Sequence, residues 1–338
     1  MKSFSSLKYL LSLSPVPFVI TGNLLGGPFS LLNAFYGLAI MTLSEKFIPE
    51  NKEDNHLTSF LPNLILVVHV FFQSACLFSL FYGIHSGALH GGWIVSAAAS
   101  TGINSALAGI TSAHELIHRK EKIFRVLGIW NLITVNYGHF YIEHIKGHHK
   151  LVGTKKDPAT AYYGESVYHF IRRTIPNQFI SSLKIEANRL QKQNSLRYSL
   201  QNFVVMIVLI EMSCCVTLFY FFGVKILLAF LLQSFISILI LEYVNYIEHY
   251  GLVRDENERV NATHSWQSDH LLSRFALIEL SRHSDHHYYA SKPYHTLKSY
   301  EESPVLPSGY FGSFYTALIP SLWFKKINPL IDKMKVTS

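Results

Sequence analysis

Residues 203–246 read FVVMIVLIEMSCCVTLFYFFGVKILLAFLLQSFISILILEYVNY, an almost continuous apolar stretch in which Gly223 marks the midpoint. A helix needs about 20 mostly apolar residues to cross the hydrocarbon core of a bilayer. The stretch therefore predicts two successive membrane spans, at 203–222 and 224–246. Such spans are helices, because lipid offers no hydrogen bonds to a backbone that leaves its own groups unpaired.

Four other apolar segments are candidate spans, and they lie at residues 9–25, 28–43, 60–84 and 91–118. The composition agrees with a membrane protein, since 49% of the 338 residues are hydrophobic and only 15% are charged, against about 25% in soluble domains. We therefore expect an all-α, polytopic membrane protein with six transmembrane helices. The whole chain, 1–338, is expected to form one membrane-embedded domain.

The positive charges predict how this domain is oriented. If the N-terminus is placed in the cytoplasm, every Lys and Arg except Lys225 falls on the cytoplasmic side. Lys and Arg collect in cytoplasmic loops of membrane proteins, so we expect both termini there. Residues 119–202 and 247–338 should then form a cytoplasmic cap. This topology explains the net charge of +7, and we expect no nucleic-acid partner.

Histidines are clustered in the cap and where the spans at 91–118 and 224–246 leave the membrane. The clusters contain His114 and His118, then His144, His148 and His149, then His249, and finally His283, His286 and His287. The i,i+4 spacing in HELIH places both of its rings on one helix face. Two of the clusters contain adjacent histidines, His148–His149 and His286–His287. Adjacent side chains point in different directions, so packing alone does not explain why such a pair occurs twice.

Histidine is the commonest metal-ligand side chain, and nine imidazoles are too many for one ion. A catalytic zinc uses about three protein ligands and one open position. Nine ligands therefore predict two metal ions, with four or five histidines each. Imidazole-rich sites suit iron, copper, zinc or nickel, and the residues alone leave this choice open.

Four acidic residues next to or near these histidines are candidate outer-sphere partners. Ligating histidines usually donate their second ring N–H to a carboxylate or a carbonyl group. The candidates are Glu115, Glu143, Glu248 and Asp285. The alternative interpretation of each is an ordinary charge near a helix end.

The histidine motifs resemble those of the alkane 1-monooxygenases, a family of membrane non-haem di-iron enzymes related to fatty acid desaturases and hydroxylases. The motifs here are HELIHR (114–119), EHIKGHH (143–149), NYIEHYGL (245–252) and LSRHSDHH (280–287). Three connecting segments are also similar to the family, DPATAYYGES (157–166), HSWQSDH (264–270) and LPSGY (306–310).

The resemblance implies a bacterial inner-membrane enzyme whose nine motif histidines bind two iron ions. It also implies O2 as co-substrate and terminal hydroxylation of medium- or long-chain n-alkanes to primary alcohols. Rubredoxin, reduced by an NAD(P)H-dependent rubredoxin reductase, would supply the electrons.

An apolar hydrocarbon is already dissolved in the bilayer, so we expect a lipid-accessible channel between the spans. Phe35, Tyr36 and Phe60 are candidate residues for its far end, although each is also explained by ordinary packing. A basic cap surface fits an acidic redox partner or anionic lipid. It includes Lys146, Lys150, Lys155, Lys156, Arg172 and Arg173.

Other functions share parts of this pattern. A fatty acyl desaturase or lipid hydroxylase, or an enzyme acting on aryl methyl groups, would have similar histidine clusters. HELIH also matches the HExxH motif of zinc proteases, in which the glutamate is the general base, but a protease leaves the later histidines unexplained. A metal transporter would need polar residues along its spans. Two residues inside spans, Glu211 and His69, are left without an assigned role.

Overall fold

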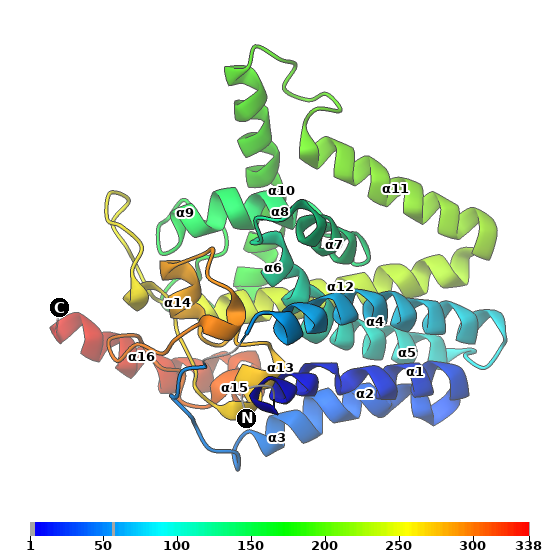
Figure 1. The fold of residues 1–338 in the computed structure, drawn as a ribbon, viewed down its shortest axis with the longest axis horizontal. Coiled ribbons are helices and arrows are strands. Elements are labelled where there is room, and N and C mark those ends of the chain that lie inside the picture. Colours follow the sequence, from blue (N-terminus) through cyan, green and yellow to red (C-terminus); the bar gives the residue numbers. More distant parts are fainter. Residues whose placement is uncertain (1–3, 56–57, 338) are drawn as a thin grey trace.

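The computed structural model describes residues 4–55 and 58–337, and the regular structure in them is helical (Figure 1). These residues form no β-strand, only two isolated bridges, Glu50 with His270 and Gln267 with Val305. The prediction of an all-α protein is confirmed.

Four helices are long and apolar enough to cross a membrane, which makes this a membrane protein. They are α4 (Phe60–His85), the continuous run of α5 (Gly92–Asn104), η4 (Ser105–Ile110) and α6 (Thr111–Ile117), then α11 (Phe203–Phe222) and α12 (Val224–His249). Helices α4, α5 and α12 run alongside one another, whereas α11 diverges from α12 (Figure 1).

Helices α5 and α12 approach each other closely at Gly102. A Cβ atom at this position would lie only 2.6 Å from the carbonyl oxygen of Gln233 on α12. Small residues allow membrane helices to pack backbone against backbone. This contact brings the ends of both helices, which carry histidine motifs, to the same region of the molecule.

The two predicted spans at 9–25 and 28–43 are broken rather than continuous helices. Their elements are η1 (Phe4–Leu13), α1 (Pro15–Leu25), η2 (Gly27–Leu31), α2 (Leu32–Phe35), the π-helix η3 (Tyr36–Met41) and α3 (Thr42–Ser44). Gly26 and Gly27 have φ values of 68° and 53°, which glycine adopts easily. The chain reverses there, and α1 packs on α4 and α5. By length and composition, the described residues thus contain four candidate spans instead of six.

Most of the remaining elements gather at one end of the long helices. The exceptions are α7 (Lys122–Ile133), which packs along α6 and α4, and the far end of α10 (Val167–Lys192), which projects beside α11 (Figure 1). The others are α8 (Phe140–Ile142), η5 (Glu143–His148), α9 (His149–Leu151), η6 (Ala262–His264), α13 (Leu271–Ala276), α14 (His283–Tyr288), η7 (Tyr294–Thr296), α15 (Gly309–Leu318) and α16 (Pro320–Thr337). A buried cluster that includes Tyr246, Trp266, Tyr310 and Trp323 joins these elements to the end of α12.

Glu211 and His69, both inside membrane helices, have polar partners. The Glu211 carboxylate on α11 accepts a hydrogen bond of 2.8 Å from the backbone N–H of Gly138, in the turn before α8. His69 is buried, and its Nε2 lies 2.7 Å from the Ser12 hydroxyl oxygen. Both residues therefore connect helices of the bundle to neighbouring segments.

Candidate metal centre

The structure brings all nine motif histidines together in two groups, each able to hold a metal ion. The first group, here called the five-histidine group, consists of His114, His118, His144, His149 and His286. The second, the four-histidine group, consists of His148, His249, His283 and His287. Within each group the candidate ligand atoms all lie within 4.8 Å of one another.

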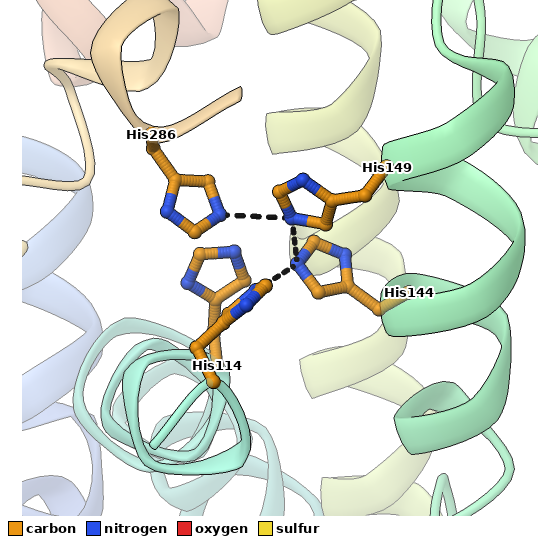
Figure 2. Close-up of side chains that lie close together, drawn as sticks. His114, His144, His149 and His286 are labelled. Carbon is orange, nitrogen blue, oxygen red and sulfur yellow. Dashed lines mark hydrogen bonds between the residues drawn. The ribbon is translucent and has the colours of Figure 1, made fainter. Parts of the chain in front are cut away.

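The rings of the five-histidine group converge from three elements, α6, the η5–α9 segment and α14 (Figure 2). The Nε2 atom of His144 is 3.0 Å from that of His118 and 3.0 Å from that of His149. The Nε2 atoms of His149 and His286 are also 3.0 Å apart.

The four-histidine group has the same kind of geometry. The Nε2 atom of His287 lies 3.2 Å from that of His148 and 2.9 Å from that of His283. The Nε2 atoms of His249 and His283 are 3.2 Å apart. Two ligand atoms about 2.1 Å from one metal, at a right angle, are about 3 Å apart. The Nε2–Nε2 distances in both groups match the distance between neighbouring ligand atoms of one metal ion.

The π-helical turn η5 explains how EHIKGHH supplies both groups. A π-helix has i→i+5 hydrogen bonds, so His144 and His149 share one face and belong to the five-histidine group. His148 points to the four-histidine group instead. A Cβ at Gly147 would lie 2.8 Å from a Glu143 carboxylate oxygen, so a larger residue would require the Glu143 side chain to move.

The protonation state of the histidines fits metal binding. Burial lowers the pKa of His144, His149, His283, His286 and His287 well below the ordinary value, and repulsion between the rings adds to this effect. The imidazoles are therefore neutral, which is the form that binds metals. Among the described residues, the buried Nε2 atom of His114 has no hydrogen-bond partner. The donor set fits a pair of transition-metal ions.

Two carboxylates contact the four-histidine group. Glu248 Oε2 lies 3.2 Å from His283 Nε2, and Asp157 Oδ2 lies 2.9 Å from His148 Nδ1. Burial raises the pKa of Asp157, but the adjacent His148 outweighs this effect, and the net shift is downward. Asp157 was not predicted as a partner of a histidine, although it begins the DPAT segment of the resemblance and follows His148 by only nine residues.

The structure gives the other three predicted outer-sphere carboxylates different surroundings. Glu115 forms a 2.9 Å ion pair with Arg119 and accepts a hydrogen bond from the Tyr294 backbone N–H, an arrangement that does not suit the general base of a zinc protease. Asp285 accepts hydrogen bonds from the Lys298 backbone N–H and the Tyr300 hydroxyl.

Glu143 is buried, and its burial raises the pKa to about 8. No hydrogen bond to a histidine is found for Glu115, Asp285 or Glu143 in the described part of the chain. Their predicted outer-sphere role therefore has no direct contact to support it.

Three apolar cavities lead away from the histidines. The first, of about 30 Å³, is lined by His114, His144, His283, Leu107 and Ile240, among others. The second, of about 40 Å³, shares Leu107 and Ile240 with the first. The third, of about 560 Å³, shares Ile240 with both and lies between α5, α10, α12 and α15.

The predicted channel residues Phe35, Tyr36 and Phe60 do not line these three cavities. Phe35 and Phe60 are exposed, by 62% and 79% of their surface. Tyr36 packs on Phe18 and forms a 2.7 Å hydrogen bond with the Ser14 hydroxyl. The sequence could not locate the cavities, because residues from helices far apart in the chain form their walls.

The predicted basic surface is partly neutralised by ion pairs. Lys146 pairs with Glu186 and Lys156 with Glu256, while Arg173 forms two contacts with Glu165. The other three basic residues of this surface have no ion pair among the described residues, and they are Lys150, Lys155 and Arg172. A polar pocket of about 370 Å³ is lined by Lys155, Lys156 and Lys184 and reaches Asp157.

Comparisons with known proteins agree with this geometry. The fatty acid desaturase family matches residues 90–315. Alkane 1-monooxygenase 2 of Alcanivorax borkumensis is 40% identical over 246 residues, which is 71% of this chain and 63% of that protein. Alkane 1-monooxygenase of Ectopseudomonas oleovorans is 35% identical over 308 residues, which is 89% of this chain and 75% of that protein. The hydroxylase component of the xylene/toluene monooxygenase of Pseudomonas putida is 26% identical over 317 residues, 91% of this chain and 84% of that protein.

The chain belongs to the fatty acid desaturase family and, within it, to the alkane 1-monooxygenases. It spans about 63% of the length of the Alcanivorax relative. The resemblance found in the histidine motifs is confirmed.

Proposed function

We propose that this protein hydroxylates the terminal carbon of medium- or long-chain n-alkanes, using O2 and two iron ions. The observation that carries the proposal is the pair of histidine groups at the end of an apolar cavity. The supporting relatives are named alkane 1-monooxygenases.

The nine histidines would hold the two irons, five at one and four at the other. When bound, the irons supply the oxygen activation that no amino-acid side chain provides. The protein keeps the imidazoles neutral through burial, and Asp157 orients His148 through its Nδ1 atom. Apolar side chains such as Leu107 and Ile240 keep water away from the reacting end of the substrate.

The substrate would enter from the bilayer along the three neighbouring cavities, which share lining residues. The outer cavity is bounded almost entirely by apolar side chains, from the membrane helices α5 and α12 and the cap helices α10 and α15. It is large enough for part of a hydrocarbon chain. The inner cavities are much narrower, so an extended chain would advance end first. This arrangement favours presentation of a terminal methyl group to the histidines.

The electrons would come from rubredoxin, itself reduced by an NAD(P)H-dependent reductase. The pocket lined by Lys155, Lys156 and Lys184 supports this partner, because Asp157, which also lines it, contacts His148 of the four-histidine group. An acidic protein would be attracted to the lysines. The pocket thus combines positive charge for an acidic partner with a short path for electrons to the four-histidine group.

For the membrane placement we propose six membrane crossings, in which the broken segments at 9–25 and 28–43 make up the first two. Both termini and the histidine-bearing cap, 119–202 and 247–338, would face the cytoplasm across the bacterial inner membrane. The location of every Lys and Arg except Lys225 on that side supports this orientation.

Aerobic conversion of n-octane tests the function. Membranes containing the protein receive rubredoxin, its reductase and NADH, and gas chromatography detects the products. We expect 1-octanol from the wild type and none from His286→Ala. An enzyme that binds two irons but oxidises no alkane of any length would overturn the alkane assignment. Xylene, which the name of the Pseudomonas putida relative suggests, and acyl lipids are then the substrates to test.

A further inference from the structure

We propose that a membrane phospholipid with an anionic headgroup binds between α4, α7 and α11. One acyl chain would occupy a cavity between these helices, and the headgroup would lie beside Arg197. The cavity has a volume of about 590 Å³, and no histidine of the described residues lines it. The inference rests on the membrane location of the chain, and neither on the metal ions nor on the alkane substrate.

Helix α11 buries only one narrow stripe of its surface. Its buried residues are Val204, Ile207 and Glu211, which are three and four positions apart. This stripe meets the turn before α8, where a Cβ at Gly138 would lie 2.4 Å from the Ile207 side chain. The neighbouring face of α11 is not buried by the described residues, so another molecule can pack there.

The cavity follows this neighbouring face of α11. Its α11 side includes Met206, Ile210, Ser213 and Thr217, which share one helix face because they are three or four positions apart. The lining continues to Leu218, so it covers about 18 Å of helix at 1.5 Å per residue. A long and narrow apolar space of this kind suits an extended acyl chain.

The opposite wall of the cavity is apolar and belongs to other helices. Its residues include Leu77 and Phe81 of α4, Ile133 of α7 and Phe230 of α12. Trp130 of α7 also lines the cavity, and 49% of its surface is exposed although its ring N–H donates a hydrogen bond to the Ser74 hydroxyl. Apolar surface of membrane helices is covered by hydrocarbon rather than by water.

The end of the cavity at the start of α11 is positively charged. Leu200, in the loop before α11, lines the cavity, and Arg189 donates a 2.9 Å hydrogen bond to the carbonyl of the following residue. Arg189 and Lys146 share the single carboxylate of Glu186. Arg197 is exposed three residues before Leu200 and has no ion pair among the described residues. Positive charge is therefore in excess at this end.

This charge favours an anionic phospholipid as the occupant. Lys and Arg residues at a membrane surface attract anionic headgroups. A plain hydrocarbon would gain nothing from the cations, and a second copy of the chain would bring the same positive charges to the same place. Helix α11 begins at Phe203, after the N-cap residue Asn202, so the charged loop lies at the membrane surface and the cavity extends into the hydrocarbon region.

A lipid at this position would support the segment that leads to the histidines. Glu211 of α11 accepts a hydrogen bond from the backbone N–H of Gly138. The chain continues from Gly138 into α8 and η5, which carries His144 and His148. A ligand that binds only the folded protein stabilises it, so the bound phospholipid would hold α11 against this turn.

Native mass spectrometry of the full-length protein tests the acyl-chain site, after reconstitution in nanodiscs with equal amounts of phosphatidylglycerol and phosphatidylcholine. We expect the wild type to retain one phosphatidylglycerol. Ser213→Trp should retain at least about 10-fold less, because the indole displaces two or more methylene groups from the cavity. Val216→Trp is the matched control, since Val216 lies on the same helix, is 65% exposed and does not line the cavity.

A second pair of variants tests the headgroup site. Arg197→Gln should reduce the preference for phosphatidylglycerol over phosphatidylcholine about 5-fold, which is the usual effect of one basic residue near anionic lipid. Lys225→Gln is the control, because Lys225 lies at the start of α12, beyond the opposite end of α11. A larger effect of Lys225→Gln than of Arg197→Gln would overturn the proposal.

Three other results would also overturn it, namely no retained lipid in the wild type, equal retention of the two lipids, or equal loss from Ser213→Trp and Val216→Trp. If Ser213→Trp does not accumulate, phosphatidylglycerol with brominated acyl chains replaces it, because bromine quenches indole fluorescence. The difference between wild type and Trp130→Phe isolates the signal of Trp130 in the cavity. This signal should be quenched more strongly than by brominated phosphatidylcholine, and equal quenching would contradict the proposal.

Discussion

The five-histidine and four-histidine groups are close neighbours but are constructed differently. In the five-histidine group, His118 and His149 are only partly buried, and no carboxylate of the described residues contacts a ring. In the four-histidine group all four rings are buried, and Asp157 and Glu248 both make contact. The comparison suggests that the four-histidine position is held by charge and hydrogen bonds, and the five-histidine position mainly by the number of its imidazoles.

The largest expected effect comes from removing one ring of each group. His286 and His287 are adjacent in α14 but belong to different groups. Changes to outer-sphere residues typically lower activity about 10- to 100-fold. His286→Ala and His287→Ala should each lower alkane oxidation by more than this. Each variant should also lose a different one of the two iron signals. Loss of the same signal from both variants would contradict the division into two groups.

Acid should weaken both groups, because their histidines are buried in the neutral form. Burial lowers the pKa of His118, His144, His149 and His286 in one group and of His283 and His287 in the other. The unfolded chain takes up protons near pH 6.5 and the folded chain does not. The free energy of unfolding is therefore fully retained above this pH. Below it, the free energy of unfolding decreases by about 1.4 kcal/mol per pH unit for each histidine.

Thermal unfolding of the metal-free protein in nanodiscs, from pH 8 to pH 5.5, measures this acid sensitivity. The unfolding temperature should decrease only in the acidic half of the range. A constant unfolding temperature would show that the rings are already solvated or protonated in the folded state. His286→Ala and His287→Ala should each reduce the slope, because each removes one of the titrating groups.

Asp157→Asn should affect the four-histidine group selectively. The amide keeps the size of the side chain but removes the charge that faces His148 Nδ1. We expect metal affinity at this position to fall about 10- to 100-fold, measured by competition with a chelator. Ser265→Ala is the milder companion, since the Ser265 hydroxyl lies 3.4 Å from His249 Nδ1. A loss of iron from the five-histidine group would contradict the comparison.

The smallest expected effect is structural and should affect both groups. Gly147→Ala introduces a Cβ 2.8 Å from Glu143 within the π-helical turn that carries His144 and His148. Crowding of this kind costs about 1–2 kcal/mol, which thermal unfolding can detect. Gly92→Ala in α5 is a control for the general effect of losing a glycine, because nothing lies within 4 Å of a Cβ there and its φ is not positive. If both irons stay bound as in the wild type, the turn tolerates the extra methyl group.

Local sequence was enough for the features that depend on spacing along the chain. The apolar stretches at 60–84, 91–118, 203–222 and 224–246 predicted the four long helices, because a helix needs a set length of apolar residues to cross a bilayer. The stretches at 9–25 and 28–43 were too interrupted for this rule. Gly26 and Gly27, both with positive φ, end the first helix.

The sequence by itself determined that nine histidines would gather at one end of a helical membrane protein, because span ends and i,i+4 spacing follow from helix geometry. The tertiary structure decided which histidines share a metal position, since the π-helical turn places His144 and His149 in one group and His148 in the other. It also decided which carboxylates matter. Glu248 reaches His283 because distant segments pack together, and Asp157 reaches His148 because the loop after α9 folds back. Glu115 adjoins a histidine in sequence but turns to Arg119.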